Sequence, residues 1–125
     1  INGTIDIKKF VEVDYVIEAV TENETVKRSV FESLDATCSK DIVLASNTSS
    51  IPITRIASWT NRPTQVCGMH FMNPVPIMKL VEIIPSITTS EETLKIVTDL
   101  AIEMKKETSL SKDVAGFIAN RILMP

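Results

Sequence analysis

The sequence predicts an α/β layered fold in which helices flank a mainly parallel β-sheet. Short apolar, β-branched runs alternate with segments whose apolar residues recur at helical spacing, and this alternation is typical of βαβ units. The chain has 125 residues, of which 44% are hydrophobic, so it is long enough for one domain with its own core. Neither an internal repeat nor a low-complexity linker divides it.

The first third of the chain predicts a strand followed by a helix. Residues 14–20 form an apolar, β-branched run of the buried-strand type. Thr21 and Glu24 then match a capping box, which predicts a helix that continues to about Ser39. One apolar stripe follows this helix because four residues recur at every fourth position: Val26, Val30, Leu34 and Cys38.

The middle of the chain predicts three more strands and one short helix. Residues 41–46 read as a buried strand, and Pro52 suits the first turn of a helix that residues 61–63 bring to an end. Residues 65–71 and 77–84 are strand candidates joined by a proline-rich turn. The short helix has an apolar face formed by Ile53, Ile56 and Ala57.

The last third predicts a helix, a short strand and a second helix. N-cap signals overlap at residues 89–92, and a strand-like piece surrounds Ser109 and Leu110. The second helix is predicted to begin at Gly116. The inward face of the helix that follows residue 92 is predicted to carry Leu94, Val97, Ala101 and Met104.

Composition and charge narrow the classes of ligand. The formal net charge is -3 and no basic block is present, so no nucleic-acid partner is expected and a small-molecule ligand is favoured. No apolar run approaches the roughly 18 residues of a membrane-spanning helix, which argues against a membrane partner. Cys38 and Cys67 lie far from each other, and with His70 they form no metal-ligand spacing, so we predict buried, reduced thiols, no metal site and an intracellular location.

Ligands of open α/β sheets bind at the carboxyl ends of the strands, where loops and helix N-termini converge. That rule selects three polar clusters: Glu22 with its neighbours, residues 47–50 and residues 70–73. Residues 47–50 suit a substrate oxygen or a cofactor amide, but N-capping of the next helix is the commoner role of such residues and is preferred on the residues alone. Glu22 and Lys27 read as an ordinary solvated helix face.

The only histidine of the chain, His70, stands before the proline-rich turn. If that turn centres near Pro76, His70 and Glu82 lie opposite each other on neighbouring strands and point to the same side. A carboxylate that holds one ring nitrogen leaves the other to exchange a proton with substrate. A purely structural His–Glu hydrogen bond explains these residues equally well. The three glycines form no G-x-G-x-x-G motif, so spacing alone proposes no dinucleotide.

Several stretches together resemble the motifs of the 3-hydroxyacyl-CoA dehydrogenase family, in the family's order and spacing. Any one of them is weakly specific, but five in register over almost the whole chain are highly specific. The resemblance implies a Rossmann-like α/β fold with NAD as cofactor. The stretches are VIEAVTEN at residues 16–23, ASNTSS at 45–50, GMHFMNPVP at 68–76, MKLVE at 78–82 and GFIANR at 116–121.

The resemblance also implies how the chain is divided. Residues 1–115 correspond to the later part of the NAD-binding domain, whose first βαβ unit and glycine-rich loop would precede Ile1. Residues 116–125 correspond to the start of a helical C-terminal domain through which the full-length protein forms a homodimer. The 125-residue chain by itself is then expected to be inactive, because the pyrophosphate site and most of the dimer interface lie outside it.

The resemblance assigns roles to individual residues. His70 matches the catalytic histidine, and Glu82 matches the carboxylate paired with it. Ser49 matches a serine near the substrate's 3-oxygen, the cofactor and the CoA moiety, and Asn120 matches an active-site asparagine. The positions that match NAD contacts are Glu22, Lys27, Ser49 and Asn73.

The implied activity is the NAD-dependent interconversion of (3S)-3-hydroxyacyl-CoA and 3-oxoacyl-CoA, in fatty-acid β-oxidation or hydroxybutyryl-CoA metabolism. The substrate partner is therefore an acyl-CoA, and cytoplasm, mitochondrial matrix and peroxisome are not distinguished. Two alternatives stay open. One is a β-hydroxyacid dehydrogenase, which would rely on a catalytic lysine instead of the His–Glu spacing. The other is a non-catalytic, crystallin-like scaffold.

Overall fold

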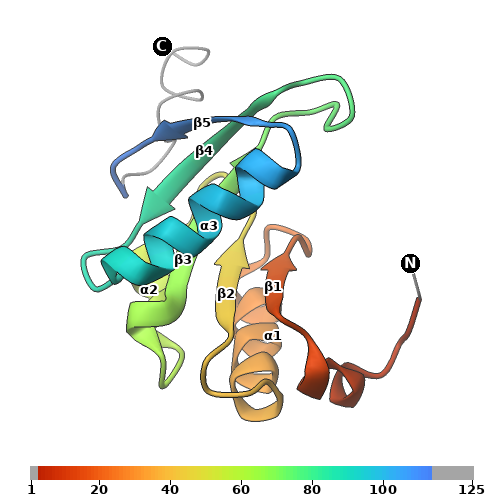
Figure 1. The fold of residues 1–125 in the computed structure, drawn as a ribbon. Coiled ribbons are helices and arrows are strands. Elements are labelled where there is room, and N and C mark those ends of the chain that lie inside the picture. Colours follow the sequence, from red (N-terminus) through yellow and green to blue (C-terminus); the bar gives the residue numbers. More distant parts are fainter. Residues whose placement is uncertain (1–2, 114–125) are drawn as a thin grey trace.

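A computed structural model describes residues 3–113 of the chain. Helices and strands alternate along most of it (Figure 1). The elements are the 3-10 helix η1 (Ile7–Glu12), β1 (Tyr15–Glu18), α1 (Glu24–Thr37), β2 (Val43–Ser46), α2 (Ile53–Ser58), the 3-10 helix η2 (Pro63–Gln65), β3 (Val66–Phe71), β4 (Leu80–Pro85), α3 (Glu91–Glu103) and β5 (Glu107–Leu110).

The five strands form one sheet in the order β1-β2-β3-β4-β5. β1, β2 and β3 run parallel, β4 is antiparallel to β3, and β5 is parallel to β4. The predicted α/β fold with a mainly parallel sheet is therefore confirmed. Within residues 3–113, no helix combines the length and the apolar character that crossing a bilayer requires.

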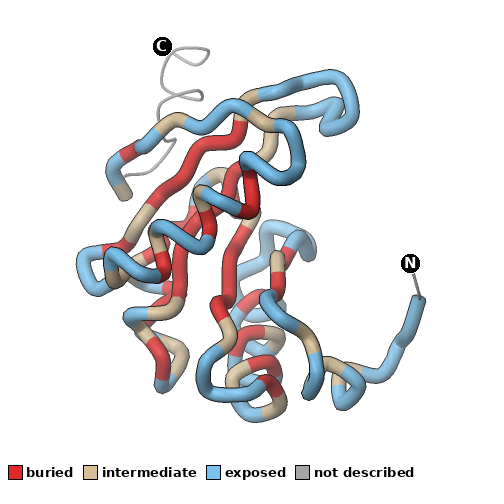
Figure 2. The backbone as a smooth tube through the Cα atoms, viewed as in Figure 1, coloured by how far each residue is buried: buried red, intermediate tan, exposed pale blue. Residues whose placement is uncertain are grey.

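Helices cover both faces of the sheet. Successive side chains of a strand point to opposite faces, so Leu44 of β2 packs with α1 and α2, whereas its neighbours Val43 and Ala45 pack with α3. The three central strands, β2, β3 and β4, are the most deeply buried part of the fold (Figure 2). The cluster on the α1/α2 face includes Val16, Phe31, Leu34, Ile53, Ile56, Val66 and Ile84, and the cluster on the α3 face includes Cys67, Met69, Val81, Ile83, Val97 and Leu100.

The start of α1 differs from the prediction. Asn23, rather than Thr21, is the N-cap, and its side-chain oxygen accepts the N–H of Val26 at 3.1 Å. The Thr21 carbonyl accepts the N–H of Asn23 at 2.7 Å, so Thr21 lies in a tight turn before the helix. Asn is as good an N-cap as Ser or Asp, and the helix begins at Glu24.

The inward stripe of α1 is also rotated from the predicted one. Lys27, Phe31 and Leu34 are buried, whereas Val26 is exposed. A strict four-residue repeat drifts about 40° per step around a helix of 3.6 residues per turn, so Val26 leaves the face that Leu34 and Cys38 share. A side chain with a charged end, Lys27, takes the vacated inward position.

The later elements follow the predictions more closely. Ser90 caps α3 by accepting the N–H of Thr93 at 3.1 Å, and Val97 and Ala101 face the core. Met104 does not face the core, because it lies at the C-cap of α3, where it is exposed. Leu100 is buried in its place. The predicted helix at Gly116 lies outside the described residues.

Strand β4 begins later than the predicted residue 77. The N–H groups of Ile77 and Met78 both donate to the carbonyl of Pro74, at 3.1 and 2.9 Å. These residues are therefore committed to the turn, and pairing with β3 starts only after it, at Val81 opposite Phe71.

Both cysteines are free and buried, which confirms the predicted thiols. Burial raises the pKa of Cys67 to about 12, although weak hydrogen bonds to the carbonyls of Gly68 and Ile84 act in the opposite direction. Burial likewise raises the pKa of Cys38. Neither thiol forms an appreciable amount of thiolate at neutral pH, so neither is a nucleophile in the folded state.

A methyl group at Gly68 is predicted to destabilise the fold. A Cβ there would lie 2.8 Å from Cδ1 of Ile53, closer than real contacts allow, and 3.0 Å from Cβ of Ile84, which is tighter than most real contacts. We expect Gly68→Ala to lower the free energy of unfolding by about 1–3 kcal/mol, as overpacking does, measured by urea denaturation. Adding Ile53→Val to Gly68→Ala removes Cδ1 of Ile53 and should restore part of the lost free energy of unfolding.

Gly3→Ala is the matched control for this prediction, because no atom lies within 4 Å of a Cβ built at Gly3. Equal stability of the Gly68→Ala and Gly3→Ala variants would show that α2 does not pack against β3 as closely as described.

Candidate active site

The carboxyl ends of the parallel strands meet at one edge of the sheet. Glu18, Ser46 and Gly68 are register partners on β1, β2 and β3. Asn47 joins the loops that follow them, since its N–H donates to the carbonyl of Glu18 at 2.8 Å and its side-chain oxygen accepts the N–H of Phe71 at 2.8 Å. Polar residues that are separate in sequence therefore come together here, as predicted.

His70 and Glu82 face each other across β3 and β4. They are register partners, and Nδ1 of His70 lies 3.3 Å from Oε1 of Glu82. Glu82 is only 1% exposed, and His70 is also buried. This confirms the predicted pairing. A carboxylate at Nδ1 holds the ring orientation and favours the tautomer with its proton on that nitrogen.

The strand alternation decides which side of the sheet this pair occupies. Gly68 and Ile84 pack on the α1/α2 face, and His70 and Glu82 lie two residues from them on the same strands. Because side chains repeat every second residue, the pair points to that same face. The loop from β2 to α2, residues 47–52, runs on this side, since its Ile51 packs in the α1/α2 cluster.

The turn between β3 and β4 contains Asn73, which the resemblance assigns to NAD. The Asn73–Pro74 peptide bond is cis. The turn extends from the sheet as an exposed loop (Figures 1 and 2). The ammonium of Lys106 donates to two carbonyls within the turn, those of Val75 and Met78. Lys106 thus ties the turn to the connection between α3 and β5.

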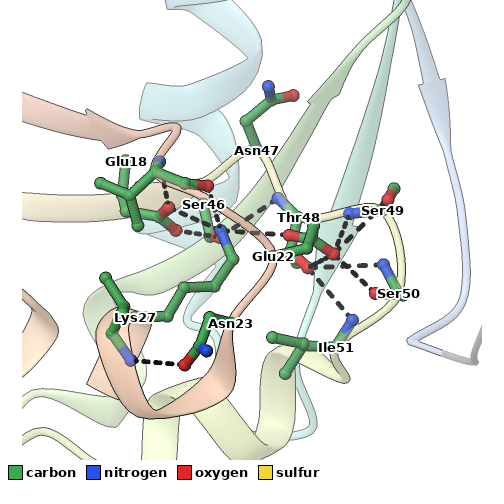
Figure 3. A network of polar contacts seen from close by, with 12 residues as sticks. Glu18, Glu22, Asn23, Lys27, Ser46, Asn47, Thr48, Ser49, Ser50 and Ile51 are labelled. Atoms are coloured by element: carbon green, nitrogen blue, oxygen red, sulfur yellow. Dashed lines mark hydrogen bonds and ion pairs between the residues drawn. The ribbon is translucent and has the colours of Figure 1, made fainter. Parts of the chain in front are cut away.

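The hydroxyls that follow β2 converge on a carboxylate. Oε2 of Glu22 accepts hydrogen bonds from the hydroxyls of Thr48 and Ser50 at 3.0 and 2.6 Å (Figure 3). The N–H and the hydroxyl of Ser49 lie 3.4 and 3.5 Å from the same oxygen. Glu22 and Ser49, both predicted site residues, therefore belong to one cluster.

The preferred reading of residues 47–50 as N-caps of the next helix is wrong. Pro52 occupies the N-cap of α2 and makes no side-chain hydrogen bond there. The carboxylate of Asp113 instead accepts the N–H groups of Ile53 and Thr54, at 2.5 and 2.6 Å. Within the loop, the Thr48 hydroxyl accepts the N–H of Ile51 at 3.1 Å and donates its own proton to Glu22 at 3.0 Å, so its role before the helix does not compete with its bond to Glu22.

The reading of Lys27 as a solvated helix residue is wrong as well. Lys27 is 1% exposed, and its ammonium lies 2.6 Å from Oε2 of Glu18 and 3.1 Å from Oε1 of Glu22 (Figure 3). It also donates to the carbonyl of Val20 at 3.2 Å. A lysine is buried only when its charge is paired, and here two carboxylates pair it.

Glu22 differs from the buried Glu18 and Lys27 because its side chain is 38% exposed. Partial burial raises its pKa, but hydrogen bonds from Ser50, Lys27 and Thr48, together with the charge of Lys27, outweigh that effect and hold the pKa of Glu22 below its ordinary value of 4.5. Glu22 is therefore a carboxylate at neutral pH. It presents a fixed negative charge at the carboxyl edge of the sheet.

The structure thus brings the predicted site residues together in two groups at one edge. Glu22, Lys27 and Ser49 form the first group, and His70 and Glu82 form the second. Asn73 lies in the adjoining turn, and Asn120 lies outside the described residues.

The sequence reasoning missed three contributors to this edge. Glu18 carried a signal, since it is a charge within an apolar strand and such a charge needs a partner. Asn47 was noticed only as part of a polar cluster, not as the tie to Phe71. Lys106 carried no signal, because its acceptors are backbone carbonyls that only the fold brings near.

Among residues 3–113, no group of three or more His, Cys, Asp or Glu side chains is placed to hold a metal ion. The chemistry available at this edge is that of a histidine–carboxylate pair beside a second, partly exposed carboxylate.

A parallel sheet with its polar site at the carboxyl edge is the arrangement of Rossmann-type nucleotide-binding domains. The family described as "3-hydroxyacyl-CoA dehydrogenase, NAD binding domain" matches residues 1–114. The chain belongs to this family, and NAD is the cofactor of the domain.

Individual relatives agree with the family match. The chain is 48% identical over all of its 125 residues to a probable 3-hydroxybutyryl-CoA dehydrogenase of Deinococcus radiodurans, and 54% identical over 112 residues, 90% of the chain, to one of Bacillus subtilis. It spans 45% and 39% of their lengths, less than half of each.

A solved structure shows the same fold. The crystal structure of (S)-3-hydroxybutyryl-CoA dehydrogenase PaaH1 from Ralstonia eutropha matches with a TM-score of 0.94 and 40% identity. The match covers 97% of this chain and 43% of that chain.

Glu22 is predicted to make the stability of the protein depend on pH. Because its folded pKa is lowered, its stabilising effect is complete above the unfolded value near 4.5 and is lost as pH falls through the folded value. Wild type should therefore exceed Glu22→Gln in free energy of unfolding at pH 7, and the difference should shrink below pH 4.5. Urea denaturation at several pH values measures this difference.

Glu103→Gln removes an exposed carboxylate from α3 and serves as the control. A Glu22→Gln difference that stays constant with pH, or that matches the control, would contradict the paired state described for Glu22.

Proposed function

We propose that the chain is the later part of the NAD-binding domain of an enzyme that interconverts (3S)-3-hydroxyacyl-CoA and 3-oxoacyl-CoA. The observation that carries the proposal is the pairing of His70 with Glu82 at 3.3 Å, beside the carboxyl edge of the sheet. A histidine held by a buried carboxylate is suited to move a proton to and from a hydroxyl group at neutral pH. Membership of the dehydrogenase family supports the same reaction.

In the oxidising direction, Nε2 of His70 takes the proton of the substrate's 3-hydroxyl group. NAD, when bound, supplies the acceptor for the hydride that leaves the same carbon. Glu82 stabilises the imidazolium that forms, since its carboxylate faces Nδ1. In the reducing direction, the imidazolium returns the proton to the oxygen.

Ser49 and Asn120 are proposed to orient the substrate's 3-oxygen. Ser49 lies in the loop on the face to which His70 points, and hydrogen-bond contact with Glu22 restricts its position. Asn120 carries its role from the resemblance of residues 116–121 to the family motif.

The residues present at the carboxyl edge fit the cofactor. Glu22 is anionic and partly exposed, so it can accept hydrogen bonds from the hydroxyl or amide groups of NAD. Lys27 lies directly beneath it. The cofactor site is proposed to comprise Glu22, Ser49 and Asn73, with Lys27, which is only 1% exposed, supporting Glu22 from beneath.

The rest of the enzyme is proposed to lie outside this chain. Residues 116–125 would begin a helical domain that completes the active site and forms a homodimer, and a preceding βαβ unit would bind the pyrophosphate. Less than half of each curated relative described above corresponds to this chain, which supports that division. The acyl-CoA is the expected substrate partner.

Replacing His70 in the full-length protein should abolish most of the turnover. General acid–base catalysis contributes roughly 10²–10⁴-fold, so we expect kcat/KM of His70→Ala to fall by about that factor. Oxidation of NADH with acetoacetyl-CoA measures turnover, and NADH fluorescence measures cofactor binding, which should persist. Unchanged turnover would exclude His70 as the acid–base group.

The isolated 125-residue chain should neither turn over acetoacetyl-CoA nor bind NADH tightly, because the proposed pyrophosphate site is absent from it. Fluorescence titration of the chain alone with NADH tests this, with the full-length protein as the positive control. Equal affinity of the two would show that the cofactor site is complete within these residues.

A further inference from the structure

A buried carboxylate stands at the end of β1, beneath the proposed cofactor residues. The side chain of Glu18 has no exposed surface, so it cannot touch a cofactor directly. Its Oε2 accepts the ammonium of Lys27 at 2.6 Å and the N–H of Val20 at 2.7 Å. Its Oε1 accepts the hydroxyl of Ser46 at 2.6 Å. Glu18 therefore links β1, β2 and α1.

The ammonium of Lys27 is held on three sides. Its three protons match three acceptors, which are Oε2 of Glu18, the carbonyl of Val20 and Oε1 of Glu22. Two of these acceptors belong to β1 and to the segment just after it. The third, Glu22, is the partly exposed carboxylate. Lys27 thus transmits the position of β1 to Glu22.

Glu18 also sets the balance of charge. Without it, the buried Lys27 would have Glu22 as its single anionic partner, and the strong Coulomb attraction at low dielectric would draw that carboxylate inward. With Glu18 present, its buried carboxylate neutralises the ammonium of Lys27. Glu22 then keeps Oε2 for the hydroxyls of Thr48 and Ser50 and keeps its exposed side for a ligand.

We propose that Glu18 is a positioning residue for the cofactor. By pairing with Lys27, it holds Glu22 and the loop of residues 48–50 in the arrangement that binds NAD. This inference rests on the proposed function, because it takes Glu22 as part of the cofactor site. It assigns Glu18 no contact with substrate, and it separates the residue from the proton transfer at His70.

The test uses Glu18→Gln in the full-length protein. Glutamine keeps the shape and a carbonyl acceptor for Lys27 but removes the charge. We expect the Kd and the KM for NADH to rise about tenfold, the scale of one hydrogen bond to a charged group. The value of kcat at saturating NADH should stay near that of wild type. NADH fluorescence and steady-state oxidation with acetoacetyl-CoA measure the two effects.

Glu32→Gln is the matched control. It makes the same chemical change on α1, where Glu32 is exposed and pairs with Arg28 at 3.7 Å. Its NADH affinity should equal that of wild type. Equal NADH affinity of wild type, Glu32→Gln and a folded Glu18→Gln overturns the inference, as does a Glu18→Gln variant that loses kcat without a change in Kd.

A double variant shows whether Glu18 acts through Lys27. The single variant Lys27→Met removes the ammonium. The double variant, Glu18→Gln with Lys27→Met, leaves no unpaired charge buried at this position, so the double variant can be tested even if Glu18→Gln alone does not fold. If the inference is right, the double variant binds NADH as well as Lys27→Met alone. An additional loss in the double variant overturns it.

The two proposals fail in different ways. If wild type binds no NADH, the proposed function fails. If wild type binds NADH and turns over acetoacetyl-CoA while the Glu18 variants bind NADH normally, only the role of Glu18 fails.

Discussion

The antiparallel pairing of β3 with β4 is the constraint on which the site depends. Side chains alternate along both strands, so a slip of one residue would turn Glu82 toward α3 and away from His70. The apolar partners prevent such a slip, because Met69 and Ile83 must face the α3 cluster while Ile84 must face the α1/α2 cluster. The histidine–carboxylate pair is thus held in place by the burial of the hydrophobic residues around it.

Two polar groups at the same edge follow different physical rules. The pair on β3 and β4 uses one carboxylate to orient one histidine. The group at the end of β1 buries charges of both signs, and it is tolerated because Lys27 lies between two carboxylates. Asn47 connects the two, since its backbone bonds to the end of β1 and its side chain to Phe71 on β3. The structure therefore couples the proposed cofactor side to the proposed catalytic side.

Much of the fold and part of the site could be predicted because the signals are local. The spacing of apolar residues placed the strands and helices, and Ser90 indicated the start of α3 by the same chemistry that it shows in the structure. The opposition of His70 and Glu82 followed from the centre of one turn and the two-residue period of strands. Where the period was read as a strict four, as in α1, Val26 was placed on the wrong face.

By itself, the sequence determined the order of the strands and α-helices up to residue 113, the mainly parallel sheet and the His70–Glu82 register, because each depends on neighbours along the chain or on one turn. The tertiary structure alone decided that Lys27 is buried, and that the hydroxyls after β2 bind Glu22 while the distant Asp113 caps α2. A charge or a hydroxyl can be satisfied by water or by many partners, and its choice depends on which distant segment the fold brings within hydrogen-bonding distance.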